Sequence, residues 1–381
     1  MEVVILGGDG FCGWPTALKF AAEGHPVTIV DNLSRRKIDV DLGSNSITDI
    51  APIQDRILVA NKLIGKIDFI NLDIASNPHE LRELIGRIQP DTVIHFAEQR
   101  AAPFSMISDR ERRYTVDNNI TGTHNLCSAI VDVSPHTHLV HLGTMGVYGY
   151  TEAFGKIPEG YLNVRINETE ADTSILYPAN PGSIYHMTKC LDQLIFQFYN
   201  KNWGLRITDL HQGIVWGINT PETSLAPELI NRFDYDGLYG TVLNRFIMQA
   251  ASGLPLSVYG TGGQSRAFIH ISDTTRCVYL AATNVQAKFK KVRIFNQVSE
   301  VRSVLELAKL LQTATKCSIN YLENPRKELA ENELYVSNQG LTSLGFEPIT
   351  LNERLIDDVR VVSQQNLNNL KVENVNNSPV W

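Results

Sequence analysis

The sequence predicts an α/β protein: a doubly wound parallel sheet followed by a smaller C-terminal α/β region. Two patterns predict this class. Short apolar runs alternate with helical periodicity from residue 3 to residue 210, which is typical of a parallel sheet covered by helices on both faces. After Gly217 the pattern breaks into shorter elements separated by prolines and glycines.

The first strand, turn and helix are the clearest elements. Residues 3–6 form an apolar run, a glycine turn follows at 7–10, and residues 11–23 have helical periodicity. A second apolar run at 27–30 ends in Asp31. Further strands are expected at 67–72, 92–96, 138–142 and 206–210, with long helices at 109–131 and 184–200. The stretch 34–66 is longer than a usual connection, so we expect a functional or partner-facing insertion there.

The composition excludes several functional classes. The 381 residues are 43% hydrophobic and 20% charged, as in a globular protein large enough for more than one domain. The net charge of −7 argues against nucleic acid as a partner. The scattered cysteines never form a CxxC pair, so we expect no disulfide framework and no metal site. Apolar runs are too short for a membrane span and strand sequence starts at Glu2, so we expect a soluble cytoplasmic protein without a leader or a membrane partner.

The turn between the first strand and helix carries a phosphate-binding pattern. Gly7, Gly10 and Gly13 have the spacing of a dinucleotide turn, where missing side chains let the backbone approach a diphosphate at the helix N-terminus. Asp31 ends the next strand and supplies the acceptor expected for a ribose hydroxyl. The sequence therefore predicts a Rossmann-type domain that binds NAD in preference to NADP.

Tyr185 and Lys189 lie four residues apart on one face of a predicted helix. An ammonium group so placed can lower the pKa of a phenol and hold a ribose, and the phenolate can then accept a hydroxyl proton. An isolated pair with this spacing is also common on helix surfaces. Thr144 follows the strand at 138–142, where its hydroxyl could share the substrate's proton or merely cap the next turn.

Together these residues resemble the signature of the extended short-chain dehydrogenase/reductases that act on nucleotide sugars. Within that family the chain is most similar to the UDP-sulfoquinovose synthases. The similarity lies in segments spread over almost the whole chain: 7–14 (GGDGFCGW), 98–103 (EQRAAP), 231–236 (NRFDYD) and 262–266 (GGQSR). The insertion at 34–66 also resembles that subfamily, whereas simple 4-epimerases are shorter there.

The resemblance implies a reaction on UDP-glucose. C4 of the sugar is oxidised by bound NAD, water is eliminated across C5 and C6, sulfite or another sulfur donor adds at C6, and the hydride returns to C4. Tyr185 would be the C4 base, Thr144 its hydrogen-bond partner and Lys189 the ribose anchor. His186 would face the sugar near C6, unless it is simply exposed on the helix. The family habit also implies a homodimer, formed through the helices at 109–131 and 184–200.

Other site residues follow from position and resemblance. Glu98, Gln99 and Arg100 follow the strand at 92–96, at the sheet edge where ligands bind, and Arg100 could hold an anion or instead pair with Glu98. The expected cofactor-binding residues are Gly7, Gly10, Phe11, Cys12, Asp31, Asn32, Arg35, Arg36, Asp73, Ile74, Phe96, Ala97, Asn119, Tyr185 and Lys189. The two arginines of this set could partly offset the repulsion between the carboxylate at 31 and a 2′-phosphate. The expected substrate-binding residues are Glu98, Gln99, Arg100, Thr144, Gln212, Asn244, Gln264, Arg266 and Arg326.

One position departs from the resemblance. Val147 stands where the sulfoquinovose synthases are expected to carry a glutamate, and an apolar side chain cannot shuttle the proton that elimination requires. Glu98 and His186 are the available substitutes. An NAD-dependent UDP-sugar 4-epimerase, which needs only the tyrosine, threonine and lysine, is therefore the alternative. A non-catalytic NAD-binding scaffold is the third hypothesis.

These assignments predict how the chain divides into domains. The NAD-binding domain would cover residues 1–216, including the insertion, and would be joined by a returning segment near 267–298. The sugar-nucleotide domain would cover 217–266 and 299–363. Residues 364–381 are rich in Asn and poor in apolar side chains, so we expect a tail that lies extended on the surface or frays.

Overall fold

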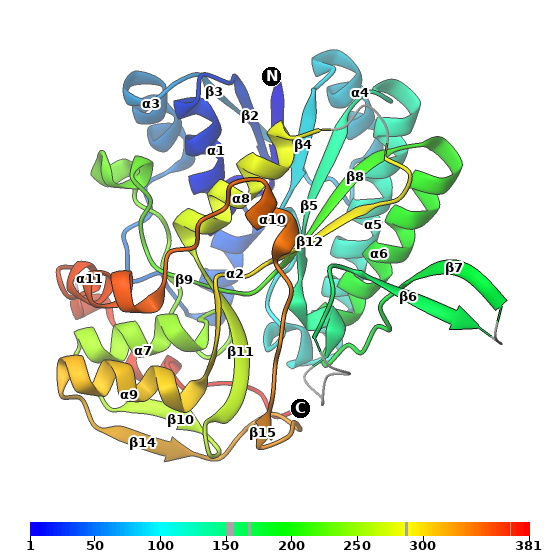
Figure 1. The fold of residues 1–381 in the computed structure, drawn as a ribbon. Helices are drawn as coiled ribbons and strands as arrows, with labels where there is room; N and C mark the ends of the chain where they lie inside the picture. Colours follow the sequence, from blue (N-terminus) through cyan, green and yellow to red (C-terminus); the bar gives the residue numbers. More distant parts are fainter. Residues whose placement is uncertain (150–155, 167–168, 286–288, 366) are drawn as a thin grey trace.

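The computed structural model describes residues 1–149, 156–166, 169–285, 289–365 and 367–381. Its centre is a seven-stranded parallel sheet in the order β12-β8-β5-β4-β1-β2-β3, which confirms the predicted fold class (Figure 1). The order runs outward from β1 in both directions, so a crevice opens above the carboxyl ends of β1 and β4. The strands are β1 (Val3–Leu6), β2 (Val27–Asp31), β3 (Ile67–Asn71), β4 (Thr92–His95), β5 (His138–Thr144), β8 (Arg206–Gln212) and β12 (Arg293–Gln297).

Helices cover both faces of this sheet because its strands are apolar on both sides. Val3 and Ile5 of β1 pack with α1 (Gly13–Ala22), α3 (Ile53–Leu63) and α8 (Ile271–Thr283). Val4 and Leu6 face the opposite way, toward α4 (Pro78–Ile88), α5 (Asp109–Val133) and α6 (Ile184–Trp203). The sheet therefore separates two apolar layers, and the returning segment contributes α8 to one of them and β12 to the sheet edge.

The insertion at 34–66 is helical and is anchored to the glycine turn. It contains α2 (Ser34–Leu42) and α3, joined by a loop that starts at Gly43, whose φ of 62° is left-handed. Arg56 of α3 is buried over the ring of Trp14 and pairs with Asp9 at 2.7 Å. A buried pair of this kind ties the insertion to the first turn of the sheet.

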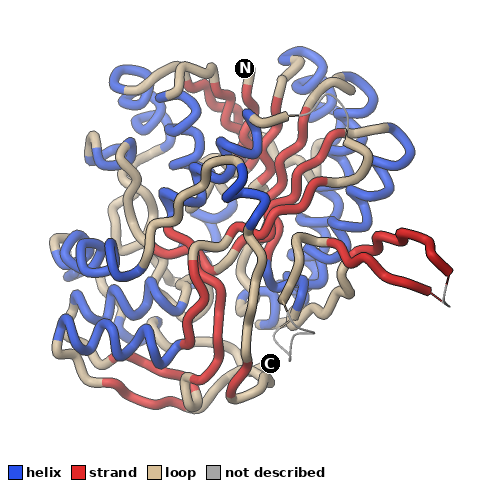
Figure 2. The backbone as a smooth tube through the Cα atoms, viewed as in Figure 1, coloured by secondary structure: helices blue, strands red, loops and turns tan. Residues whose placement is uncertain are grey.

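The smaller region lies beside the carboxyl edge of the large sheet (Figure 2). Its core contains Trp216, Phe246 and Phe268. Its elements are β9 (Ile214–Trp216), α7 (Val242–Ala251), β10 (Leu256–Tyr259), β11 (Gly263–His270), β13 (Glu300–Ser303), α9 (Val304–Thr315), β14 (Ile319–Leu322), β15 (Glu331–Asn332) and α11 (Leu351–Ser363). The short helix α10 (Gln339–Ser343) packs against α8 and against β12 of the large sheet. A hairpin of β6 (Tyr161–Ile166) and β7 (Thr169–Leu176) projects from the other side of the molecule.

The C-terminal segment lies on the surface and is tied to the body by hydrogen bonds. The backbone N–H of Lys371 donates to the Tyr235 hydroxyl at 3.0 Å, and the Ser378 hydroxyl donates to the carbonyl of Gly237 at 2.6 Å. Asn366, inside this segment, lies outside the described residues. None of the described helices is long and apolar enough to cross a membrane. The cysteines, which all lie in the described residues, form no disulfide.

Candidate active site

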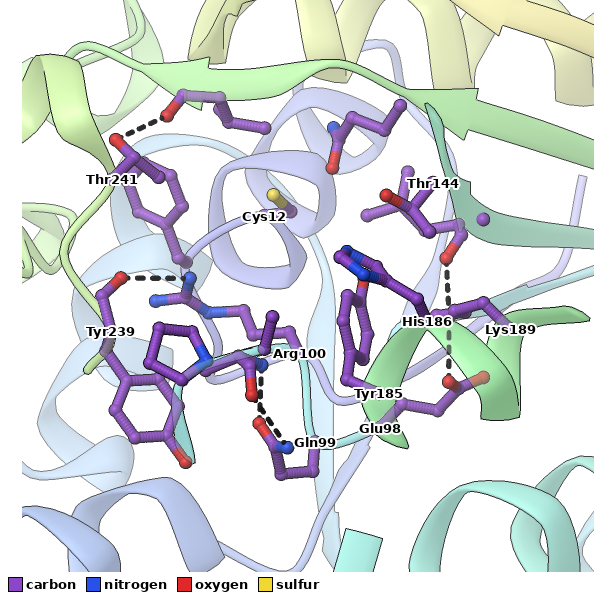
Figure 3. Close-up of a pocket in the computed structure, with 18 of the residues that line it drawn as sticks. Cys12, Glu98, Gln99, Arg100, Thr144, Tyr185, His186, Lys189, Tyr239 and Thr241 are labelled. Atoms are coloured by element: carbon purple, nitrogen blue, oxygen red, sulfur yellow. Dashed lines mark hydrogen bonds and ion pairs between the residues drawn. The ribbon is translucent and has the colours of Figure 1, made fainter. Parts of the chain in front are cut away.

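A cavity of about 970 Å³ occupies the crevice above β1, β4 and β5, and the smaller region closes its other side. This volume is in the range of cavities that bind organic ligands. Figure 3 shows side chains from several elements converging on it, among them Cys12 at the start of α1, Arg100 after β4, Thr144 at the end of β5 and Tyr185 of α6. The expected catalytic residues Thr144, Tyr185, His186 and Lys189 therefore line one cavity.

The glycine turn leaves space that only glycine can leave. A Cβ on Gly7 would lie 2.7 Å from the backbone of Phe96 and Ala97, and one on Gly13 would lie 2.1 Å from the carbonyl oxygen of Gly7. Cys12 is the N-cap of α1 and makes no side-chain cap bond. The turn thus fits a dinucleotide diphosphate, which would meet backbone N–H groups at the helix N-terminus.

Asp31 lies at the mouth of this turn, at the end of β2. Its carboxylate accepts hydrogen bonds from the backbone of Asp9 at 2.9 Å and of Leu33 at 2.7 Å. Burial, with a further contribution from the negative charge of Asp9, raises the pKa of Asp31 to about 6. It is ionised at neutral pH and can accept a hydrogen bond from a ribose hydroxyl.

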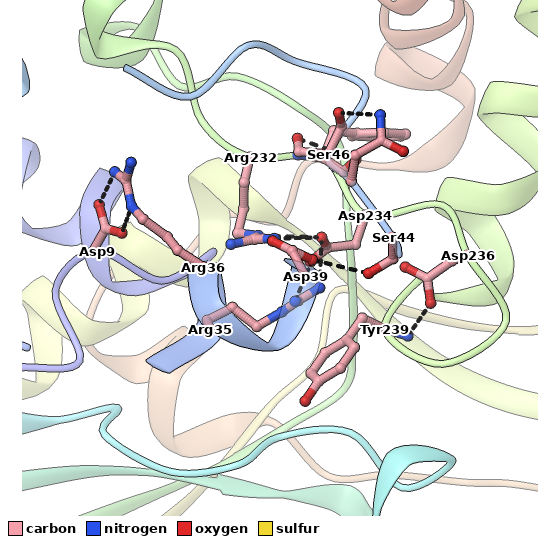
Figure 4. Close-up of polar contacts among 12 residues, drawn as sticks. Asp9, Arg35, Arg36, Asp39, Ser44, Ser46, Arg232, Asp234, Asp236 and Tyr239 are labelled. Carbon is pink, nitrogen blue, oxygen red and sulfur yellow. Dashed lines mark hydrogen bonds and ion pairs between the residues drawn. The ribbon is translucent and has the colours of Figure 1, made fainter. Parts of the chain in front are cut away.

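Arg35 and Arg36, which follow Asp31 in sequence, are both paired with carboxylates (Figure 4). Arg36 donates to both oxygens of Asp9, at 2.6 and 2.8 Å, and does not line the cavity. Arg35 lines the cavity, contacts Asp39 and Asp234, and stacks with its guanidinium 3.6 Å from the ring centroid of Tyr239. These contacts direct both charges into the protein and away from an incoming 2′-phosphate.

Tyr185 and His186 enter the cavity from the first turn of α6 (Figure 3). The hydroxyl of Ser183 accepts a hydrogen bond from the N–H of His186 at 3.1 Å and so caps the helix. The rings of Tyr185 and His186 lie 5.2 Å apart. Thr144 faces them from the end of β5, and its hydroxyl oxygen accepts from the N–H of Gly146 at 3.1 Å. Thr144 therefore caps the next turn and still presents a hydroxyl proton to the cavity.

His186 is buried and neutral. Burial, together with the positive charges of Arg326 and Arg266, lowers its pKa to about 3. Its ring packs against Gly146 so closely that a Cβ there would lie 2.3 Å from the imidazole Cδ2. The glycine therefore sets where this imidazole lies in the site.

Lys189 and Glu98 form an ion pair beside Tyr185. The Nζ of Lys189 lies 2.7 Å from Glu98 Oε2 and donates to the carbonyl of Leu142, also at 2.7 Å. Arg100 consequently does not pair with Glu98, the alternative considered from the sequence; it contacts Asp234 instead. Its guanidinium lies 5.6 Å from the ring centroid of Phe11.

The far end of the cavity is lined by Arg266 and Arg326. Arg266 contacts the carboxylate of Glu328. Arg326 lies with its guanidinium 5.2 Å from the ring centroid of Trp381, whose indole N–H donates to the carbonyl of Gly182 at 3.1 Å. Sequence reasoning missed Trp381, because no pattern in the Asn-rich tail connects it to the site.

Four predicted site residues do not line the cavity: Arg36, Asn119, Asn244 and Gln264. Asn119 accepts from the N–H of Gln99 at 2.8 Å, and so supports the loop that does line it. Asn244 accepts from the N–H of Gly217 at 3.2 Å, and Gln264 donates to the carbonyl of Tyr259 at 3.4 Å. The other predicted site residues all line the cavity.

The comparisons with known proteins agree with this architecture. The model of the NAD dependent epimerase/dehydratase family matches residues 3–296. This chain belongs to that family. It is 42% identical to the chloroplastic UDP-sulfoquinovose synthase of Spinacia oleracea, over 100% of this chain and 79% of the relative. It is 38% identical to the UDP-sulfoquinovose synthase of Sulfolobus acidocaldarius, over 95% of this chain and 91% of the relative.

Solved structures share the fold of this family member. The UDP-glucose 4-epimerase of Thermotoga maritima, determined with UDP-glucose, aligns with a TM-score of 0.71 at 21% identity, over 94% of this chain and 98% of that one. The UDP-glucuronic acid 4-epimerase of Bacillus cereus, determined with UDP-glucuronic acid and NAD, aligns with a TM-score of 0.68 at 21% identity, over 96% and 99%. The predicted family resemblance and the NAD cofactor are confirmed.

Proposed function

We propose that this protein converts UDP-glucose and sulfite to UDP-sulfoquinovose. One observation carries the proposal: a single cavity joins the dinucleotide turn to Thr144, Tyr185 and His186, in a chain 42% identical along its whole length to a protein named UDP-sulfoquinovose synthase. NAD, when bound, supplies a hydride acceptor for C4 of the sugar and later returns that hydride.

Tyr185, Thr144 and Lys189 have separate roles in the proton transfer at C4 of the sugar. Tyr185 takes the proton of the C4 hydroxyl, and the hydroxyl of Thr144 donates a hydrogen bond to the same sugar oxygen. The ammonium of Lys189 favours the phenolate form of Tyr185 by its positive charge. Arg266 and Arg326 supply positive charge to the diphosphate of the sugar nucleotide.

We assign the proton transfer of the elimination step to His186. Val147 is 2% exposed within an apolar cluster and does not line the cavity, and Glu98 is held by Lys189. His186 would remove the C5 proton and pass a proton to the leaving C6 hydroxyl, and sulfite then adds at C6 while C5 regains a proton. A bound diphosphate would raise the low pKa of His186, because its negative charge opposes the nearby arginines that help to lower that pKa.

We also propose a homodimer formed through α5 and α6. The outer face of α6 carries exposed apolar side chains at Leu191, Leu194 and Phe198, spaced so that they share one stripe of the helix. A second copy of the chain would cover this stripe. Our proposed domains remain residues 1–216 with the returning segment near 267–298, and residues 217–266 with 299–363, and the cavity lies between them.

The decisive experiment is to incubate the purified protein with UDP-glucose, with and without sulfite. The sugar nucleotides are followed by mass spectrometry and by NMR of the sugar ring. A sulfonated product that forms only with sulfite supports the proposal. UDP-galactose in both tubes would replace it with the 4-epimerase, which the burial of Val147 outside the cavity favours as the second candidate.

Two variants control this experiment. Tyr185→Phe removes the proposed base, so turnover should fall by a factor of about 10² to 10⁴ while NAD binding is retained. Tyr321→Phe makes the same chemical change on an exposed side chain of β14 and should leave turnover unchanged. Full activity of Tyr185→Phe would refute the assigned base.

A further inference from the structure

A group of ionisable side chains lies almost wholly out of solvent beside Tyr185. They come from β4 and the loop after it, from β5, from β8 and from α6. We call this group the buried charge cluster; it consists of His95, Glu98, His141, Lys189, Asp192, Asp209 and His211. Burying charges is costly unless each is paired, so the arrangement of the charges in this cluster requires an explanation.

Lys189 is the member of the cluster that acts on Tyr185. Burial alone would lower the pKa of Lys189, but the carboxylate of Glu98 holds it above its ordinary value. Besides Glu98 and the carbonyl of Leu142, Nζ lies 3.0 Å from His141 Nε2. Glu98, His141 and Asp192 have the spacing of a metal site, but the ammonium of Lys189 is already the cation paired with Glu98.

The contacts continue from Glu98 across the sheet. Glu98 Oε1 lies 2.9 Å from His141 Nε2, and His141 Nδ1 lies 2.8 Å from Asp209 Oδ1. The second oxygen of Asp209 lies 3.0 Å from His211 Nε2, and His211 Nδ1 lies 2.6 Å from the hydroxyl of Tyr148. Every link is within hydrogen-bond distance, so each charge has a fixed partner.

Opposite charges alternate along the contacts from Lys189 to Asp209. Burial and Lys189 lower the pKa of His141, but Asp209 and Glu98 outweigh them and raise it to about 9, so it is a cation at neutral pH. Burial would raise the pKa of Glu98, yet Lys189 and His141 hold it well below its usual range, so it is an anion. Asp209 is likewise an anion because His211 and His141 overcome its burial. Two cations therefore face two anions.

Asp192 and His95 are the two members of the cluster that burial keeps uncharged. Asp192 has no hydrogen-bond partner for either oxygen within the described residues, and burial, reinforced by Glu98, raises its pKa well above the ordinary value. His95 lies 3.5 Å from Glu98, and burial lowers its pKa to about 3. The hydroxyl of Thr123, which donates to Glu98 at 3.3 Å, is the polar group that α5 contributes.

We propose that Glu98 is a positioning residue: its carboxylate holds the ammonium of Lys189 beside Tyr185 and balances its charge. Tyr185 then lies beside an ion pair without net charge. The pKa of Tyr185 is therefore higher than it would be beside an unpaired ammonium. The inference rests on the proposed roles of Tyr185 and Lys189. Without Glu98, the ammonium of Lys189 would lower the pKa of Tyr185.

The test compares Glu98→Gln with the parent protein in two ways. The first is the ultraviolet titration of tyrosinate, with the signal of Tyr185 isolated by subtracting the titration of the same protein carrying Tyr185→Phe. The second is the pH profile of UDP-glucose turnover. The matched control is Asp192→Asn, which changes a buried carboxyl that is already neutral. Glu98→Gln should move both the tyrosinate signal and the acid limb of the profile to lower pH by about one unit, and Asp192→Asn should move neither.

Two outcomes would overturn the proposal. One is a folded Glu98→Gln variant in which Tyr185 titrates as in the parent. The other is an equal shift in Asp192→Asn, which would make the effect a general response of the cluster to a lost carboxyl group. If Glu98→Gln does not fold, Glu98→Asp is used in its place, because the shorter side chain places the carboxylate farther from Nζ of Lys189. It should shift the titration in the same direction, and no shift would refute the inference.

The two readouts separate this inference from the proposed function. The tyrosinate titration needs no substrate, so it reports on Glu98 even if UDP-glucose is not turned over. If the parent protein does not turn over UDP-glucose, with or without sulfite, the proposed function is refuted but the inference about Glu98 is not.

Discussion

A glutamate introduced at position 147 tests the placement of that side chain most directly. Val147 lies in the 3₁₀ turn at Met145–Tyr148, and its neighbours in the apolar cluster include Tyr177 and Val298. We expect Val147→Glu to bury a carboxyl group within this apolar cluster. The variant therefore asks whether position 147 can supply the proton shuttle that the synthase resemblance would place there.

The magnitude follows from the pKa of such a group. A buried glutamate has a pKa of about 8, against about 4.3 in the unfolded chain. Because the folded-state pKa is the higher one, folding favours the protonated form, and the penalty is absent at low pH and grows as the pH rises toward 8. At about 1.4 kcal/mol per pH unit, the penalty is about 1 kcal/mol at pH 5 and about 5 kcal/mol at pH 8.

Val147→Gln is the matched control, because it adds similar volume and polarity without a titrating group. Urea unfolding of both variants at pH 5 and pH 8 isolates the ionisation penalty as the difference between them. Equal stability of the two variants at pH 8 would refute the reasoning. It would mean that the side chain at 147 reaches water, a cation or the cavity, and the elimination step would then need a different assignment from His186.

Three further predictions concern the cofactor, the substrate and the assembly. Protonation of Asp31 should weaken NAD binding by the parent protein as the pH falls through 6, as measured by fluorescence titration. Asp31→Asn should bind NAD about 5-fold more weakly at pH 7.5, with little dependence on pH. The same pH dependence of NAD affinity in the parent and the variant would contradict this prediction. Trp381→Ala removes the hydrogen bond to Gly182 and the ring beside Arg326, so the KM for UDP-glucose should rise about 10-fold, equivalent to about 1.4 kcal/mol, with kcat nearly unchanged. Phe198→Glu should convert the proposed dimer to monomers in sedimentation, and an unchanged mass would exclude Phe198 of α6 from the interface.

The sheet and the glycine turn could be predicted because their signals are local. An apolar run, three glycines and Asp31 lie within one strand-turn-helix-strand unit, so neighbouring residues alone indicate the structure. The Tyr185 and Lys189 pair was found for the same reason, since four residues on a helix define one face. The cavity brings these local signals together at one sheet edge.

Partners that are distant in sequence could not be predicted. Arg36 is four residues beyond Asn32 in sequence, but its carboxylate partner, Asp9, lies on a different turn. Between Glu98 and Lys189 the described chain contains the long helix α5 and the strands β5, β6 and β7, and only the folded sheet places the two side chains 2.7 Å apart. The composition of the tail indicates few buried contacts, but it carries no information on where a single Trp381 docks.

The docking of the tail has a practical consequence for handling the protein. Trp381 lines the cavity, next to Gly182 and Arg326, so any affinity tag or surface linker attached after it starts at the cavity wall. Met1 lies near His25, at the opposite end of β1 from the glycine turn. Affinity tags and surface linkers should therefore be attached at the amino end. Kinetic measurements on protein tagged at the carboxyl end would include the effect of an obstructed cavity.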